Sequence, residues 1–173
     1  MSNYKGERMK KDIIIRPQMT LLGISARTSN AREMNPDTAL IGKTWQAFFK
    51  DNQQDAILHR KQPGKLVAVY TDYESDEHGD YTYFLGEEVT HIATISTGFE
   101  ALTIPEQTYA KFTSASGKMP TVCIELWQTI WTMQPSDFGG KRNYLADFEI
   151  YDERSQDPNQ TILDIYIGLS HAH

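Results

Sequence analysis

The second half of the chain repeats the first half, and this repeat constrains the fold more than any other feature. Three motifs recur with their residue types kept: Trp45-Gln46 as Trp127-Gln128, Phe84-Leu85-Gly86 as Tyr166-Ile167-Gly168, and Pro17-x-x-Thr20 as Pro105-x-x-Thr108. The offset is 82 residues for the first two and 88 for the third, so the loops between strand and helix differ in length. A unit this short is marginal alone, so we expect two half-domains that share one core, with a seam where a ligand can bind.

The spacing of apolar residues predicts the same order of elements in both units, namely strand, helix, strand, strand. In the first unit the expected elements are strands at 13–15 and 19–25, a helix from 38 to about 54, and strands at 65–73 and 81–89. Asp37 or Thr38 is the expected N-cap of the helix. The two later strands flank a turn-rich link, which is typical of a hairpin.

The second unit predicts a strand at 107–114, a helix around 124–131, and a hairpin formed by 144–152 and 161–169. Residues 91–104 contain enough β-branched side chains for extra strand pairing across the seam. Two helices and paired strands favour the α+β class, an antiparallel sheet covered by two helices. We expect a flexible basic segment over 1–12 and one domain over 13–173, with repeats at about 13–90 and 100–170.

The charge distribution disfavours nucleic-acid binding. The net charge is −6, with +3 in residues 1–11 and −9 in the remainder. An acidic body opposes the displacement of counterions from phosphate. The stretch 71–90 holds seven acidic residues and no Lys or Arg, which attracts cations or forms a solvated hairpin tip. No apolar run is long enough to span a membrane and no signal peptide is evident, so we expect a cytoplasmic protein.

Motifs for cofactors, metals or covalent catalysis are weak in this sequence. Cys123 is the single cysteine, so it forms no internal disulfide, and a buried bystander thiol is the preferred interpretation. His59, His78 and His91 are scattered, and the pair at 171 and 173 is terminal, so no metal site is expected. No Ser nucleophile elbow or Gly-rich phosphate loop is present, and no cofactor is expected.

The expected strand at 144–152 contains a glutamate, Glu149, in an unusual setting of aromatic and apolar residues. Alternation points Phe148 and Ile150 to one face and Glu149 to the other; if the apolar pair meets the helix, Glu149 lies on the opposite face beside Tyr151. The repeat makes Tyr70 the counterpart of Tyr151, and Ala68 that of Glu149. A buried carboxylate needs a basic partner or a cationic ligand. The alternative from periodicity alone is an exposed strand glutamate.

Four stretches in this order resemble the GyrI-like family, the AraC-type effector-binding domain found alone or fused to bacterial transcription factors. They are Ile104-Pro-Glu-Gln-Thr-Tyr-Ala-Lys-Phe112, Glu125-Leu-Trp-Gln-Thr-Ile-Trp131, Asp147-Phe-Glu-Ile-Tyr-Asp152 and Ile162-Leu-Asp-Ile-Tyr-Ile167. The resemblance covers about 14–169 and implies two βαββ (SH2-like) units around a central groove with a pseudo-two-fold axis. Members bind lipophilic, often cationic compounds there.

The resemblance also implies which residues bind the ligand. The glutamate of the Phe-Glu-x-Tyr strand is the buried anion of the family's pocket, and it falls on Glu149. Aromatic side chains supply the walls through cation–π attraction. The expected ligand-binding residues are Glu149, Tyr151, Tyr70, Tyr73, Tyr83, Phe84, Tyr109, Trp127, Trp131 and Tyr166. Some of these aromatics are expected to be core; Trp45 is assigned to the core, and Trp127 and Trp131 are left open.

The expected function is the capture of lipophilic, cationic aromatic compounds for sensing or sequestration. Fused regulators of the family carry a helix-turn-helix region, which about a dozen N-terminal residues cannot supply, so regulation would need a protein partner such as a transcription regulator. Two alternatives stay open. Glu149 could act as the general base of a hydrolase of an electrophilic toxin, as some relatives suggest, or the protein could bind DNA gyrase.

Overall fold

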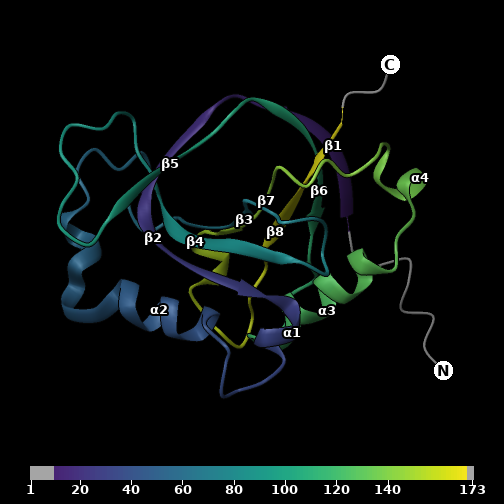
Figure 1. Ribbon diagram of the computed structural model, residues 1–173, viewed down its shortest axis with the longest axis horizontal. Helices are drawn as coiled ribbons and strands as arrows, with labels where there is room; N and C mark the ends of the chain where they lie inside the picture. The colour runs from purple at the N-terminus through teal and green to yellow at the C-terminus, as the bar shows by residue number, and fades with distance from the viewer. Residues whose placement is uncertain (1–9, 171–173) are drawn as a thin grey trace.

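The repeated motifs fold into two copies of the expected unit in the computed structural model, which describes residues 10–170 (Figure 1). The first unit comprises β2 (Met19–Ser29), α2 (Ile41–Phe49), β3 (Leu66–Thr71) and β4 (Asp80–Glu88). The second comprises β6 (Gln107–Thr113), α3 (Thr121–Trp131), β7 (Ala146–Tyr151) and β8 (Asp164–Leu169). The α+β class and the order of elements are therefore confirmed.

The strands of residues 10–170 all belong to one antiparallel sheet of eight strands, in the order β1-β6-β8-β7-β3-β4-β2-β5. The two units meet at its centre, where β3 pairs with β7 and Ala68 lies opposite Glu149. These two residues are also counterparts in the repeat. The pseudo-two-fold axis therefore passes through this pair, and Glu149 lies at the seam.

Each unit lends one strand to the other unit. The strand β1 (Lys10–Arg16) precedes β2 but pairs with β6, and β5 (Glu100–Ile104) precedes β6 but pairs with β2. Pro17 and Pro105 lie at the two bends, where a residue without an N–H costs no ladder hydrogen bond. The expected strand pairing of the segment between the units is thus confirmed for its last five residues. The start of β1 at Lys10 moves the boundary of the expected N-terminal segment, whose first nine residues lie outside the described part of the chain.

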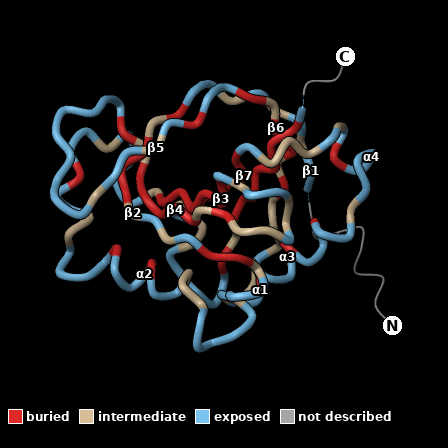
Figure 2. Tube along the Cα trace, in the orientation of Figure 1, coloured by how far each residue is buried: buried red, intermediate tan, exposed pale blue. Residues whose placement is uncertain are grey.

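The sheet separates two apolar clusters, so its central strands are buried on both faces (Figure 2). The helix-side cluster contains Phe48 from α2 and Leu126, Trp127 and Ile130 from α3, together with alternate residues of β3 and β4. The opposite cluster contains Phe148 and Ile150. The conditional expectation that this apolar pair meets the helix is wrong: the Glu149 face does. Every residue of β7 is buried, so alternation of polarity could not tell the faces apart.

The helix of the first unit, α2, is shorter than predicted, and its N-cap is not one of the two residues expected from the sequence. After Phe49 the chain continues as the 3-10 segment η1 (Lys50–Ala56), in which Asp51 and Asn52 have left-handed φ values of 54° and 52°. Leu40, not Asp37 or Thr38, is the N-cap, and it makes no side-chain cap hydrogen bond. The carboxylate of Glu33 accepts from the N–H groups of Leu40 and Ile41 instead, at 2.8 and 3.2 Å, which satisfies two free donors of the helix. A cap supplied from outside the helix leaves no local sequence signal.

Three short helical segments were not expected from the sequence. They are α1 (Asn30–Glu33), α4 (Pro135–Phe138) and η2 (Glu153–Ser155). The acidic stretch 71–90 is also less exposed than its composition suggests, because Arg60 pairs with the buried Glu87 at 3.2 Å and Lys61 with Glu88 at 3.0 Å. Within 10–170, no helix has the length and apolar character needed to cross a bilayer.

Candidate functional site

Glu149 is buried at the centre of the sheet, on the face that α2 and α3 cover. It lies in β7 opposite Ala68, and 2% of its surface is exposed. The small Ala68 leaves space on the helix side of the sheet, and α3 brings Trp127 over this space. The seam between the repeats therefore holds one carboxylate rather than a symmetric pair.

Four side chains donate hydrogen bonds to this carboxylate. Tyr70 Oη and Trp127 Nε1 donate to Oε2 at 2.8 and 2.6 Å, and Cys123 Sγ lies 3.5 Å from the same oxygen. Tyr151 Oη donates to Oε1 at 2.5 Å. An ionised carboxylate only accepts hydrogen bonds, and this arrangement offers it donors from three elements of the fold.

The donors around Glu149 are neutral, so its charge has no cationic partner among residues 10–170. Burial, followed by the negative charge of Glu149, raises the pKa of Tyr70, Tyr83 and Tyr151 well above the ordinary value. The same two causes raise the pKa of the Cys123 thiol. All four groups therefore stay protonated, and Tyr70, Tyr151 and Cys123 keep the hydrogen that they donate to the carboxylate.

Aromatic rings enclose the carboxylate. The ring of Tyr70 lies edge-on to Tyr83 and Trp127, with centroids 5.2 and 5.0 Å away. Trp45 lies edge-on to Tyr151 at 5.1 Å and donates from Nε1 to Tyr83 Oη at 2.8 Å. Trp45, Tyr70 and Cys123 are partly exposed, so this side of the cluster, called here the Glu149 cluster, borders the solvent.

The structure brings only some of the predicted site residues together. Tyr151, Tyr70, Tyr83 and Trp127 surround Glu149. Trp131 follows one turn later on α3, 6.2 Å from the Trp127 ring and 46% exposed. Three further aromatics lie in the opposite apolar cluster, across the sheet: Phe84, Tyr109 and Tyr166. Their role in ligand binding stays a prediction, and their position gives it no support.

Sequence reasoning missed two members of the Glu149 cluster. Trp45 was assigned to the core, and it does pack against the helix-side apolar cluster, but it is also partly exposed and lies edge-on to Tyr151. The signal was available, since Trp45 is the repeat counterpart of Trp127. Cys123 was interpreted as a bystander, but it precedes Trp127 by four residues and therefore shares its helix face.

A second buried carboxylate lies two residues away on the same face and is neutralised by the protein itself. Asp147 is 0% exposed, and its Oδ2 accepts from Arg142 Nη2 at 2.8 Å and from Tyr73 Oη at 2.7 Å. Its Oδ1 accepts from the N–H of Gly168 at 2.8 Å. Tyr73 is thus placed in the Asp147 network rather than at Glu149.

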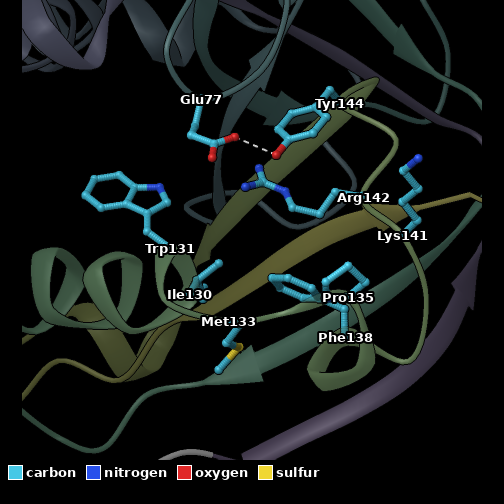
Figure 3. A pocket seen from close by; sticks show the side chains of 9 residues that line it. All are labelled: Glu77, Ile130, Trp131, Met133, Pro135, Phe138, Lys141, Arg142 and Tyr144. Carbon is cyan, nitrogen blue, oxygen red and sulfur yellow. Dashed lines mark hydrogen bonds between the residues drawn. The ribbon is translucent and has the colours of Figure 1, made fainter.

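A pocket of about 200 Å³ lies beyond the C-terminal end of α3 (Figure 3). Apolar side chains form one side and polar ones the other, and the lining residues are Glu77, Ile130, Trp131, Met133, Pro135, Phe138, Lys141, Arg142 and Tyr144. Arg142 therefore contacts both this pocket and the buried Asp147.

The histidines do not form a metal site in the part of the chain that the structure describes. No group of three or more His, Cys, Asp or Glu side chains that could hold a metal ion occurs there. The rings of His59 and His91 lie 3.9 Å apart on exposed loops. The terminal His171 and His173 lie outside the described residues.

Comparisons with known proteins identify relatives of this chain. Residues 12–169 match the family model described as "Cass2: Integron-associated effector binding protein". YobU of Bacillus subtilis (strain 168), whose name marks it as a candidate transcriptional regulator, is 29% identical over 147 residues, which are 85% of this chain and 89% of YobU. The expectation of an effector-binding domain is confirmed by the family match.

Two solved structures show the same fold. The integron cassette protein VCH_CASS2 of Vibrio cholerae superposes with a TM-score of 0.73 at 28% identity, over 92% of this chain and 95% of its own. SAV2435, solved bound to tetraphenylphosphonium, superposes with a TM-score of 0.71 at 16% identity, over 93% of this chain and 94% of its own. At 16% identity, the similarity to SAV2435 shows a shared fold and nothing more.

Proposed function

The chain belongs to the Cass2 family of integron-associated effector-binding proteins, and from that premise we propose that the Glu149 cluster binds a lipophilic aromatic cation, for sensing or sequestration. One observation carries the proposal: Glu149 is a buried carboxylate with four neutral donors and no cationic partner among the described residues. Burying an uncompensated charge costs several kcal/mol. A bound cation would offset that cost.

The hydrogen bonds favour a particular kind of cation. The carboxylate already accepts from Tyr70, Trp127 and Tyr151, so a primary ammonium group with three N–H donors would find only about one of the carboxylate's four acceptor positions free. A quaternary ammonium or phosphonium ion has no N–H group and needs only proximity to the charge. Ring faces add about 0.5–2 kcal/mol for each well-placed cation–π contact. We therefore expect bulky cations with spread charge to bind better than small amines.

Binding requires movement of the rings that cover the carboxylate. Trp45 and Tyr70 are the partly exposed aromatics over Glu149, so they are the rings whose movement would open the cluster to the solvent. Displacing Trp45 breaks its hydrogen bond to Tyr83, a net loss of about 1 kcal/mol, and its edge-on contact with Tyr151, worth about 0.5–1.5 kcal/mol. The cluster can therefore open at modest cost, and ring contacts tolerate ligands of varied shape.

The known ligand of a structural neighbour has this chemistry. Tetraphenylphosphonium, bound to SAV2435, is a lipophilic aromatic cation without an N–H group. It is accordingly the probe of choice for this chain. A protein partner, whether a transcription regulator or DNA gyrase, stays a prediction.

The test is a calorimetric titration with tetraphenylphosphonium and, as a neutral analogue, triphenylphosphine oxide. We expect saturable binding of the cation and much weaker binding of the neutral compound. Glu149→Gln should weaken cation binding by about tenfold or more, since one buried charge at close range is worth at least that factor. Glu125→Gln is the matched control, because Glu125 lies exposed on α3 and its loss removes the same formal charge.

Two results would count against the proposal. If Glu125→Gln weakened binding as much as Glu149→Gln, the attraction would come from the overall charge and not from the cluster. If the compound recovered after incubation were hydrolysed, with an ester-bearing cation as probe, Glu149 would serve as a general base and the protein would be a hydrolase. Recovery of the intact ester supports a binding role.

A further inference from the structure

The geometry points to a second, separate binding site, for a small aromatic carboxylate, in the pocket between α3, α4 and Arg142 (Figure 3). This pocket does not include Glu149 or any of its four donors. The inference therefore does not rest on the proposed function, and the two sites differ in the sign of the charge that they recognise.

The size of the pocket sets the size of its ligand. Its volume is about 200 Å³, and a cavity of about 150 Å³ is known to hold benzene. One six-membered ring with a short acidic substituent fits this volume. Larger drug-like molecules need about 300 Å³ or more.

The lower side of the pocket is built to receive an apolar ring. Ile130 and Phe138 are buried there, and Met133 and Pro135 complete the surface between α3 and α4. Trp131 forms one wall and keeps 46% of its surface exposed. A ring that enters the pocket would remove apolar surface of Trp131 from water, at about 25 cal/mol for each Å².

The polar side presents a guanidinium with unused donors. The Arg142 side chain is only 9% exposed, and its single protein acceptor among residues 10–170 is Asp147, through Nη2. Its Nε is buried without a hydrogen-bond partner in that part of the chain. Buried donors are nearly always satisfied in folded proteins, so this guanidinium has capacity for another acceptor. Figure 3 shows it extending toward the space between Glu77 and Trp131.

The charges of the lining residues favour an anion. Arg142 and Lys141 contribute two positive charges to the lining, and Glu77 contributes one negative charge. Asp147, which lies outside the lining, already offsets part of the charge of Arg142, so the free charge comes mainly from Lys141 and the anion preference from the open donors of the guanidinium. Glu77 is already engaged, because Tyr144 Oη donates to its Oε2 at 2.5 Å. The Tyr144 ring also packs against the guanidinium, 4.4 Å from its carbon, and fixes its plane. A guanidinium held in one plane is the preferred partner of a carboxylate in proteins.

The experiment is an NMR titration of the whole chain with three probes of one shape: benzoate, benzyl alcohol and benzylammonium. We expect saturable shifts at the Trp131 indole and at the amides around Met133 and Lys141, with a dissociation constant on the order of 1 mM for so few atoms. Benzoate should bind about tenfold better than benzyl alcohol, as a charge-assisted hydrogen bond predicts. Equal affinity for the three probes, or a preference for benzylammonium, would overturn the assignment.

Variants separate this pocket from the Glu149 cluster. Trp131→Ala should weaken benzoate binding about tenfold, and because Trp131 is half exposed, the fold should persist. Arg142→Lys keeps the charge beside Asp147 but removes the planar fork, and it should remove the preference for benzoate over benzyl alcohol. Glu149→Gln should leave benzoate binding unchanged within about twofold. Loss of benzoate binding in Glu149→Gln, with normal binding in Trp131→Ala, would show that benzoate binds at the Glu149 cluster and would refute the inference.

Discussion

Two buried carboxylates on the same face of β7 are treated in opposite ways by this fold. Asp147 is paired with Arg142 and receives two further donors. Glu149, two residues along the strand, receives only neutral donors within the described chain. A charge that the protein neutralises contributes to stability, and a charge that it leaves uncompensated is available to a ligand. The contrast is therefore the strongest physical argument that Glu149 serves binding and Asp147 serves the fold.

Removing the cation from the Asp147 pair should have the largest effect. Arg142→Met leaves a fully buried carboxylate without its partner, so we expect a loss of about 3–5 kcal/mol in the free energy of unfolding. Urea denaturation measures it, with Lys141→Met as the control on the neighbouring residue. The double variant Arg142→Met with Asp147→Asn should recover part of the loss. No recovery would mean that Arg142 stabilises by packing alone.

Neutralising each carboxylate in turn tests the comparison directly. Asp147→Asn should cost about 2–3 kcal/mol, because it breaks a buried ion pair and leaves Arg142 uncompensated. Glu149→Gln should change the free energy of unfolding by less than this, because removal of an uncompensated buried charge stabilises the fold while the hydrogen bonds from Tyr70, Trp127 and Tyr151 become weaker. Equal destabilisation by both substitutions would remove the distinction between the two sites.

Alkaline pH offers a further way to sharpen the comparison. A phenol whose pKa is raised in the folded state stabilises the fold fully below the ordinary tyrosine value of about 10, and this contribution is lost as the pH rises toward the folded pKa. Burial and then the charge of Glu149 raise the pKa of Tyr70, Tyr83 and Tyr151. Glu149→Gln removes the second cause, so the loss of stability that begins near pH 10 should end at a lower pH, and be smaller in total, in the variant than in the wild type.

Tyr109 supplies the internal control for this pH experiment. Burial on the opposite face raises its pKa to about 12, and Glu149 is not among the causes. Its tyrosinate absorbance should therefore appear at the same pH in the wild type and in Glu149→Gln. A shift of the whole tyrosine titration, Tyr109 included, would indicate partial unfolding rather than loss of a local charge.

Each hydroxyl group that donates to Glu149 should contribute less to stability than the Arg142–Asp147 ion pair does. Tyr70→Phe removes one hydrogen bond to a charged acceptor, worth about 1.5–3 kcal/mol in a buried setting. In the Glu149→Gln background the same substitution should cost less, so a double-mutant cycle on unfolding free energies measures the coupling. Additive effects would mean that the 2.8 Å contact contributes little to stability.

The sequence predicted the units and their order because each depends on local patterns and on the repeat. Motif spacing placed Ala68 and Glu149 as counterparts, and the sheet pairs them at its centre. The N-cap of α2 could not be predicted in this way, because Glu33 lies outside the helix and supplies the cap from α1. Contacts of this kind depend on tertiary structure and leave no signature within the element.

The sequence could not predict which face of the sheet each side chain of the central strands occupies, and the reason is different. Alternation identifies a face only where one side meets water, and here β7 and β8 are buried throughout. Aromatic residues from both faces therefore entered the candidate site together. Tyr70 and Tyr151 are on the face of Glu149, whereas Tyr109 and Tyr166 pack against Phe148 across the sheet.

The smallest predicted effect tests that assignment of faces. Tyr166 stacks on Phe148 with ring centroids 4.6 Å apart, and Arg16 lies over it at 4.9 Å, so its phenol has no contact with Glu149. Tyr166→Phe should leave tetraphenylphosphonium affinity unchanged within about twofold. Tyr83→Phe is the matched variant on the helix side, where the hydroxyl accepts from Trp45, and it should change the affinity by more because opening the cluster no longer breaks that hydrogen bond. If Tyr166→Phe had the larger effect in the same calorimetric titration, the ligand would enter the opposite face, and Glu149 would act on it only through the sheet.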